Sequence, residues 1–175
     1  PQPGQTVVIN GAAGAVGSMA GQIAKLAGAQ TIGITSSQAK CDWLVNELGF
    51  DAAINYHEGN LYEQLNAAAP DRIDVIFDNV GGDILDESLR LIAMRGVVLL
   101  CGSTSQYPAE TIQGPRNYIW LGTMRARLQG LVVFYYADRY AEARQRMARW
   151  IKAGSLKTPE YLIDGTVADF PAAFR

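Results

Sequence analysis

Cysteine and histidine are scarce in this sequence, and the scarcity excludes several classes of site. The 175 residues include two cysteines and one histidine. Cys41 and Cys101 form no CxxC pair, which is typical of a protein from a reducing compartment. We therefore expect a cytoplasmic location, with both thiols serving as packing residues, and we predict no metal site.

An excess of charge of one sign and long apolar runs are missing as well. The net charge of −2 gives no electrostatic basis for a nucleic-acid partner. No apolar run approaches the roughly 18 residues that a membrane-spanning helix needs, so no membrane partner is expected. With 49% apolar and 18% charged residues, the composition is that of one globular domain.

The two ends of the chain are unusual for a native protein. The sequence begins at Pro1 rather than Met. It stops where a helix is predicted to begin, with Asp169 as its N-cap and Pro171 in its first turn. We therefore expect the sequence to be a fragment of a longer polypeptide.

Glycines are concentrated directly after the first apolar run, residues 6–10. In residues 11–17, Gly11, Gly14 and Gly17 are spaced three apart. A strand, a glycine-rich turn and a helix can seat a pyrophosphate, because the backbone comes close and free N–H groups point at the anion. A strict Gly-x-Gly-x-x-Gly would need a glycine at Ala12, so the match to a dinucleotide fingerprint is close but imperfect.

Short apolar runs alternate with amphipathic stretches along the chain. Strands are predicted at 6–10, 30–34, 52–55, 73–77, 96–101 and 128–134, with a last one at 160–163. Helices are predicted at 14–27, 37–48, 61–69, 84–91, 118–124 and 138–153. Most of the strands are almost wholly apolar, which predicts a parallel sheet with helices on both faces. The predicted fold class is α/β, a doubly wound Rossmann sheet of six strands in the order 3-2-1-4-5-6.

No acidic residue follows the second predicted strand. In an NAD site, an Asp or Glu there accepts hydrogen bonds from the ribose 2′-hydroxyl and repels a 2′-phosphate. Here residues 35–40 offer the hydroxyl of Ser36 and the ammonium of Lys40 near the start of a helix. This combination favours a phosphate and predicts NADP(H); the alternative is that Lys40 is an ordinary solvated lysine.

Other candidate cofactor-binding residues follow the remaining strands. Tyr56 follows the third strand and either lies against the adenosine or is a half-exposed structural residue. Asn79 follows the fourth strand, where it either binds the nicotinamide half of the cofactor or belongs to a turn. Gly102 and Tyr107 follow the fifth strand, near the switch point. Residues 131–133 either offer backbone groups to a carboxamide or form a buried edge strand.

Several motifs together resemble a known family. They lie at residues 10–17, 22–26, 48–51, 55–56, 77–82, 101–102 and 171–174. In order and spacing they resemble the zinc-independent medium-chain dehydrogenase/reductases. Within these, the chain looks most like the leukotriene B4 12-hydroxydehydrogenase/15-oxoprostaglandin 13-reductase group of NADPH-dependent alkenal/one oxidoreductases.

The resemblance implies a role for each matching position. The turn around Ala12 holds the pyrophosphate, Lys40 takes the 2′-phosphate, and Tyr56 accompanies it. Asn79 lies by the nicotinamide half, Tyr107 borders the cofactor, and Leu131 and Val133 belong to the segment that contacts the nicotinamide. The predicted cofactor-binding residues are Ala12, Gly14, Ala15, Val16, Gly17, Ser36, Lys40, Tyr56, Asn79, Cys101, Gly102, Tyr107, Leu131 and Val133.

The resemblance also implies a function. Residues 1–175 would form the NADP(H)-binding domain of an oxidoreductase that reduces the C=C bond of enones or enals. A domain resembling the chaperonin GroES and a C-terminal segment would complete the protein, which is expected to be a homodimer. No catalytic residue is assigned within the chain, and the isolated domain is expected to be inactive.

Five alternative functions remain to be weighed against this one. A quinone reductase or a zinc-dependent alcohol dehydrogenase of the same superfamily stays open, as does a non-catalytic NADP-binding module. A short-chain dehydrogenase is disfavoured because no tyrosine is followed four residues later by lysine. A methyltransferase is disfavoured because it would need an acid after the second strand.

Overall fold

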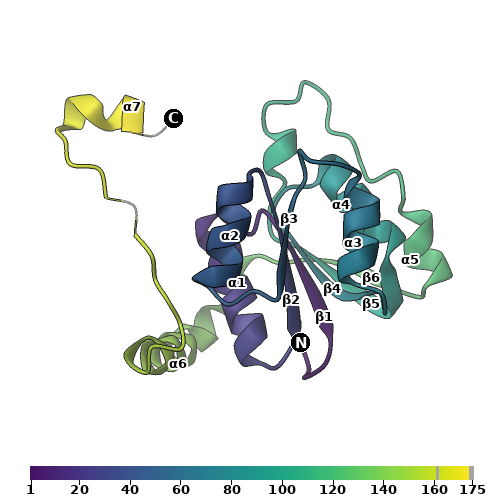
Figure 1. Ribbon diagram of the computed structural model, residues 1–175, viewed down its shortest axis with the longest axis horizontal. Helices are drawn as coiled ribbons and strands as arrows, with labels where there is room; N and C mark the ends of the chain where they lie inside the picture. The colour runs from purple at the N-terminus through teal and green to yellow at the C-terminus, as the bar shows by residue number, and fades with distance from the viewer. Residues whose placement is uncertain (161, 174–175) are drawn as a thin grey trace.

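The computed structural model describes residues 1–160 and 162–173. Within them, six parallel strands form one sheet in the order β3-β2-β1-β4-β5-β6 (Figure 1). The strands are β1 (Thr6–Asn10), β2 (Gln30–Thr35), β3 (Ala52–Asn55), β4 (Ile73–Asp78), β5 (Ile92–Leu100) and β6 (Arg127–Gly130). The predicted fold class and strand order are confirmed.

Helices cover both faces of the sheet (Figure 1). On one face lie α1 (Ala15–Leu26), α2 (Gln38–Asn46) and α6 (Tyr140–Lys152); on the other lie α3 (Leu61–Ala68), α4 (Gly82–Arg90) and α5 (Ile119–Thr123). Side chains of the central strand β1 alternate between the two faces, as the period of a strand requires. Val7 and Ile9 pack in the cluster beneath α1 and α2, and Val8 packs in the cluster beneath α3 and α4.

Small residues let α1 lie close to the sheet. A Cβ added at Gly21 would be 1.9 Å from the Phe50 ring, and one at Gly33 would be 2.9 Å from Cβ of Ala12. Ala12 is fully buried. The alanine that interrupts the glycine fingerprint is therefore accommodated by a glycine on the neighbouring strand β2.

The chain leaves the body of the domain after α6. Leu156 is buried, and the side-chain amide of Gln22 in α1 bonds both backbone groups of Lys157, at 2.8 Å to its N–H and 3.1 Å to its carbonyl. The described residues beyond 157 lead away from the sheet to α7 (Phe170–Ala173) (Figure 1). None of the helices in the described segments combines the length and apolarity needed to cross a membrane.

Several predicted boundaries are wrong at the C-terminal edge of the sheet. The strand predicted at 128–134 ends at Gly130, because its partner β5 ends at the paired residue Leu100. A 3₁₀ helix, Val133–Arg139, follows it and delays the start of α6. The strand predicted at 160–163 is not formed at residues 160, 162 and 163, and Tyr161 lies outside the described residues.

The predicted capping residues are partly corrected. The N-cap of α2 is Ser37, whose side chain accepts a hydrogen bond from the Lys40 N–H. Near the chain end, Thr166 is the N-cap of a 3₁₀ helix, Val167–Asp169, that leads directly into α7, so Asp169 lies inside the helical turn. The Asp169 carboxylate accepts from the Thr166 N–H at 2.8 Å. The two residues form a capping box that precedes α7.

Candidate cofactor-binding site

A pocket of about 490 Å³ lies where β1, β2 and β4 end. Ligands of doubly wound sheets bind at this edge, outside the carboxyl ends of the strands. We call it the turn pocket, and it is lined by Gly11, Ala13, Gly14, Ala15, Val16, Gly17, Thr35, Ser36, Lys40, Tyr56, Asn79, Val80, Ile84 and Thr104.

Unpartnered backbone amides gather at the start of α1. The N–H groups of Ala15, Val16 and Gly17 have no acceptor in the described part of the chain, and none of the first-turn residues is acidic. The N-cap Gly14 donates its own N–H to the Gly11 carbonyl at 3.1 Å. Free amides and the helix dipole make this end of α1 suited to an anion.

Glycine is required at two positions of the turn for different reasons. Gly11 has φ +69°, in the left-handed region that disfavours a side chain. A Cβ at Gly17 would lie 2.4 Å from the Gly11 carbonyl oxygen and 2.9 Å from Cα of Ala12, and both are backbone atoms. The strand and the helix therefore approach too closely at residue 17 for any larger residue.

A cationic corner closes the turn pocket beside β2. The Lys40 ammonium donates to Ser36 Oγ at 3.1 Å, and Lys40 remains exposed. Tyr56 faces this corner from the end of β3, with its ring 4.2 Å from the His57 ring between centroids. Lys40 is the one charged residue in the pocket lining as described, so the corner can receive a dianionic group without a competing carboxylate.

A buried carboxylate organises the turn after β4. Asp78 accepts from Asn10 Nδ2 at 2.7 Å and from the Gly81 N–H at 3.1 Å. Its backbone carbonyl accepts from the N–H groups of Cys101 and Gly102. Burial raises the pKa of the Asp78 carboxyl, and these hydrogen bonds act against that rise. Asp78 thus ties together the ends of β1, β4 and β5.

Asn79, beside this carboxylate, lines the turn pocket. Its Nδ2 donates to the Asn10 carbonyl at 3.4 Å, and its own backbone carbonyl accepts from the Thr104 N–H at 3.0 Å. The side chain of Asn79 is therefore held at the pocket wall by the neighbouring strand and by the segment after β5.

A second, mostly apolar pocket of about 790 Å³ adjoins the first. Val16 lines both pockets, so they lie next to each other at the start of α1. The second pocket is lined by Cys101, which follows β5, and by Leu131 and Val133, which follow β6. From α6 it is lined by Met147 and Trp150. Cys101 is exposed rather than packed, contrary to the sequence prediction, whereas Cys41 is buried as predicted.

The structure brings most of the predicted site residues together, but not all. Ala12 lines neither pocket, because its side chain lies in the core and its N–H donates to the Ile34 carbonyl at 3.0 Å. Tyr107 is 72% exposed and also lines neither. Gly102 lines a third pocket, of about 330 Å³, beside α4.

Sequence reasoning missed several lining residues. Thr35 follows the rule that residues at strand ends face the ligand, and that rule could have identified it. Val80 and Ile84 approach the pocket only through the fold, so no local signal marks them. Among the described residues, no three His, Cys, Asp or Glu side chains gather as a metal site would require.

Comparison with known proteins places this geometry in a family. The model of the family described as zinc-binding dehydrogenase matches residues 15–152. YfmJ of Bacillus subtilis (strain 168) is 43% identical over 178 residues, covering 99% of this chain and 52% of YfmJ. The 2-alkenal reductase (NADP(+)-dependent) of Nicotiana tabacum is 39% identical over 166 residues, covering 94% of this chain and 48% of the reductase.

A solved structure shows the same fold. CurA from Vibrio vulnificus, in a crystal structure of its complex with NADPH, superposes with a TM-score of 0.92 at 37% identity, covering 99% of this chain and 53% of CurA. The chain therefore spans about half the length of the relatives it matches. By its family match and its relatives, the chain belongs to the zinc-binding dehydrogenase family, as its resemblance to medium-chain dehydrogenase/reductases predicts.

Proposed function

We propose that this chain is the NADP(H)-binding domain of a reductase that acts on the C=C bond of α,β-unsaturated ketones and aldehydes. The observation that carries the cofactor assignment is the Lys40–Ser36 corner, where a cation and hydroxyls face a pocket lined by no described carboxylate. The substrate class is supported by the 2-alkenal reductase of Nicotiana tabacum, which is 39% identical.

The residues of the turn pocket fit the parts of NADP(H). We assign the pyrophosphate to the unpartnered backbone N–H groups of Ala15, Val16 and Gly17. Gly14 has no side chain and so leaves space for the pyrophosphate beside them. We assign the 2′-phosphate to Lys40 and Ser36, with Tyr56 beside the adenosine.

The apolar pocket fits the nicotinamide half. NADPH, when bound, supplies the hydride that is transferred to the β-carbon of the enone or enal. Asn79 and the segment that includes Leu131 and Val133 would orient the ring, and Cys101 would border it. No general acid is assigned within the chain, so we propose that the domain alone turns over little substrate.

The cofactor assignment is tested by fluorescence titration with NADPH and NADH. In Lys40→Ala, loss of a charge-assisted contact to the 2′-phosphate should cost about 1.5–3 kcal/mol, or roughly 10- to 100-fold in NADPH affinity. NADH affinity should stay unchanged. Lys152→Ala is the matched control, because it removes the same charge from an exposed position of α6 outside both pocket linings.

The result distinguishes a phosphate contact from a general effect. Equal losses for NADPH and NADH in Lys40→Ala would contradict the role of Lys40, and so would an equal loss of NADPH affinity in Lys152→Ala. Assays of the complete polypeptide on an enone, an enal and a quinone then test the substrate class. Turnover of the quinone alone would favour a quinone reductase instead.

We further propose a homodimer formed through the edge strand β6, and a cytoplasmic location. All four residues of β6 are exposed, and one side of the strand is unpaired in the described sheet. Edge strands readily pair with a second copy. The exposed free thiol of Cys101 fits a reducing compartment, and the location is tested by fractionating cells that produce the complete polypeptide.

A further inference from the structure

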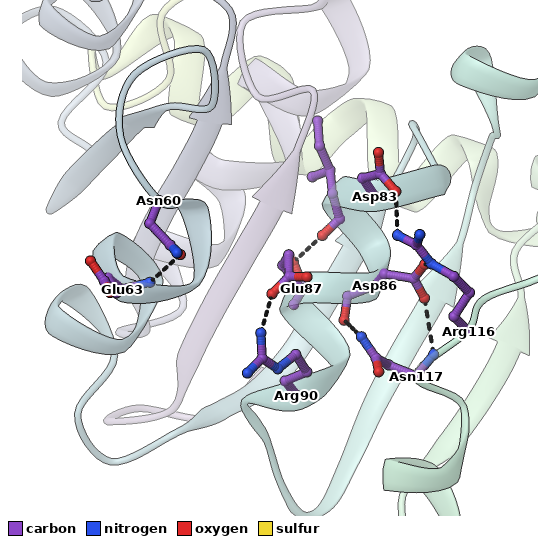
Figure 2. A network of polar contacts seen from close by, with 10 residues as sticks. Asn60, Glu63, Asp83, Asp86, Glu87, Arg90, Arg116 and Asn117 are labelled. Atoms are coloured by element: carbon purple, nitrogen blue, oxygen red, sulfur yellow. Dashed lines mark hydrogen bonds and ion pairs between the residues drawn. The ribbon is translucent and has the colours of Figure 1, made fainter.

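The irregular segment 101–118, between β5 and α5, is attached to the domain near both of its ends. Near its start, the Thr104 N–H donates to the Asn79 carbonyl at 3.0 Å, and Ser105 Oγ donates to the Val80 carbonyl at 2.6 Å. Near its end, Arg116 and Asn117 bond to α4 (Figure 2). Between the two attachments most residues are exposed.

The second attachment is centred on the carboxylate of Asp86, whose side chain is only 4% exposed. One of its oxygens accepts from Arg116 Nε at 2.9 Å, and the other accepts from the Asn117 N–H at 3.1 Å (Figure 2). Asn117 Nδ2 also donates to the Asp86 backbone carbonyl at 3.0 Å. A buried carboxylate is costly unless it is paired, so segment 101–118 supplies the partners that Asp86 requires.

A second carboxylate adds little. Arg116 also pairs with Asp83, but the Asp83 side chain is 86% exposed, and solvent screens such pairs strongly. The hydrogen bond that Arg116 donates to Asp86, together with the charge of Asp83, raises the pKa of Arg116 above its already high value. Arg116 therefore stays charged wherever the protein is folded, and Asp86 is its principal partner.

The segment is also braced internally. The Gln113 N–H donates to Gln106 Oε1 at 3.0 Å, across seven residues. Ile112 and Pro115 line the third pocket together with Leu85 of α4. The bond from Gln113 to Gln106 connects the later part of the segment to the 3₁₀ helix Thr104–Gln106, which contains Thr104.

We propose that Arg116 and Asp86 form a latch that holds segment 101–118 against α4 and so positions Thr104 and Asn79 at the turn pocket. This inference rests on the proposed function. Arg116 and Asp86 are positioning residues, because they act on the pocket through the hydrogen bond from Thr104 to Asn79. Opening the latch would leave the pocket wall in place for only part of the time.

The test uses Arg116→Ala and a matched control on the same helix. Glu87→Gln breaks the 2.7 Å ion pair between Glu87 and Arg90, which lies on α4 but makes no contact with segment 101–118 (Figure 2). Two quantities are measured on each variant: hydrogen exchange of the Thr104 and Ser105 amides, and the Kd for NADPH. Arg116→Lys keeps the charge but cannot span both carboxylates, so it separates charge from geometry.

In Arg116→Ala we expect faster exchange at Thr104 and Ser105, which are more than ten residues from the substitution. If the wall is then in place about a tenth of the time, the Kd for NADPH rises about tenfold. Arg116→Lys should be intermediate, and Glu87→Gln should match the wild type in both measurements.

Two results would overturn the latch: unchanged exchange in Arg116→Ala, or faster exchange with an unchanged Kd for NADPH. Equal effects in Glu87→Gln would attribute the change to α4 in general and would also refute it. A wild-type chain that binds no NADPH would instead refute the proposed function, while the exchange data would still report whether the latch controls the segment.

Discussion

Substitution of Gly17 by alanine tests whether the close approach of α1 to β1 carries the energy that the structure implies. The added Cβ would lie 2.4 Å from the Gly11 carbonyl oxygen, whereas real Cβ atoms keep at least 3.0 Å. The start of α1 must therefore move by at least 0.6 Å, the difference between these distances. No side-chain rotation can relieve the contact, because the atoms that it meets belong to the backbone.

The expected cost follows from two opposing effects. Overpacking of this kind costs about 1–3 kcal/mol. Alanine also gains up to about 1 kcal/mol over glycine within a helix, which hides part of that cost. Gly122→Ala in α5 provides the control, because a Cβ there meets nothing within 4 Å and the helix gain is the same in kind.

The difference between the two variants isolates the clash. Urea unfolding should find Gly17→Ala about 1–3 kcal/mol less stable than Gly122→Ala, and thermal unfolding should separate them by about 2–12 °C for a domain of this size. The shifted amides of α1 should also weaken NADPH binding in Gly17→Ala alone. Equal stability and equal NADPH affinity in the two variants would refute the argument from close approach.

Two further predictions concern a carboxylate and the sheet edge. Burial tends to raise the pKa of Asp51, but hydrogen bonds from Lys25 and Thr31 outweigh it and lower the pKa below 3.8. The resulting stability is present above pH 3.8 and is lost as the pH falls through the lowered pKa, so in urea unfolding Asp51→Asn should destabilise at pH 7, and the difference from the wild type should shrink progressively as the pH falls below 3.8. Directly after β6, the Leu131 N–H donates to the Leu100 carbonyl of β5. Backbone N–H groups alternate in direction along a strand, so the Gly130 N–H points away from β5. Gly130→Pro should leave the fold intact and convert a dimer to a monomer in sedimentation, whereas a monomeric wild type or an unaffected dimer would contradict pairing through β6.

The sheet was predictable because its signal is local and repeated. The strand β1 is buried throughout and β2 at every residue but Gln30, and each is followed by a helix. The strand order then follows from the glycine turn after β1, which identifies a doubly wound sheet.

Boundaries failed where a partner, rather than the sequence, decides them. β5 begins at Ile92 instead of residue 96, across an irregular stretch in which Arg95 has φ +62°. A non-glycine residue in that conformation gives no signal in the sequence. β6 stops at Gly130 although apolar residues continue beyond it, because β5 offers no further partner.

The candidate site could be predicted from the sequence only where the type of a residue by itself indicates its chemical role. Lys40, Ser36 and the turn glycines are chemically distinctive, and the structure gathers them at one pocket. The close packing of Ala12 against Gly33 was not predictable, because the two residues are 21 positions apart in the sequence and only the fold brings them together. Tyr107 was chosen by its nearness in sequence to β5, and the structure leaves it outside both pockets.

The double hydrogen bond between Gln22 and the backbone of Lys157 has a mechanical consequence. Because the Gln22 side-chain amide bonds both the N–H and the carbonyl of Lys157, it holds the outgoing chain as a neighbouring strand would. The chain beyond Lys157 therefore leaves the domain from a fixed point on α1, and a pull on residues 158–160 or 162–173 reaches this helix through Gln22.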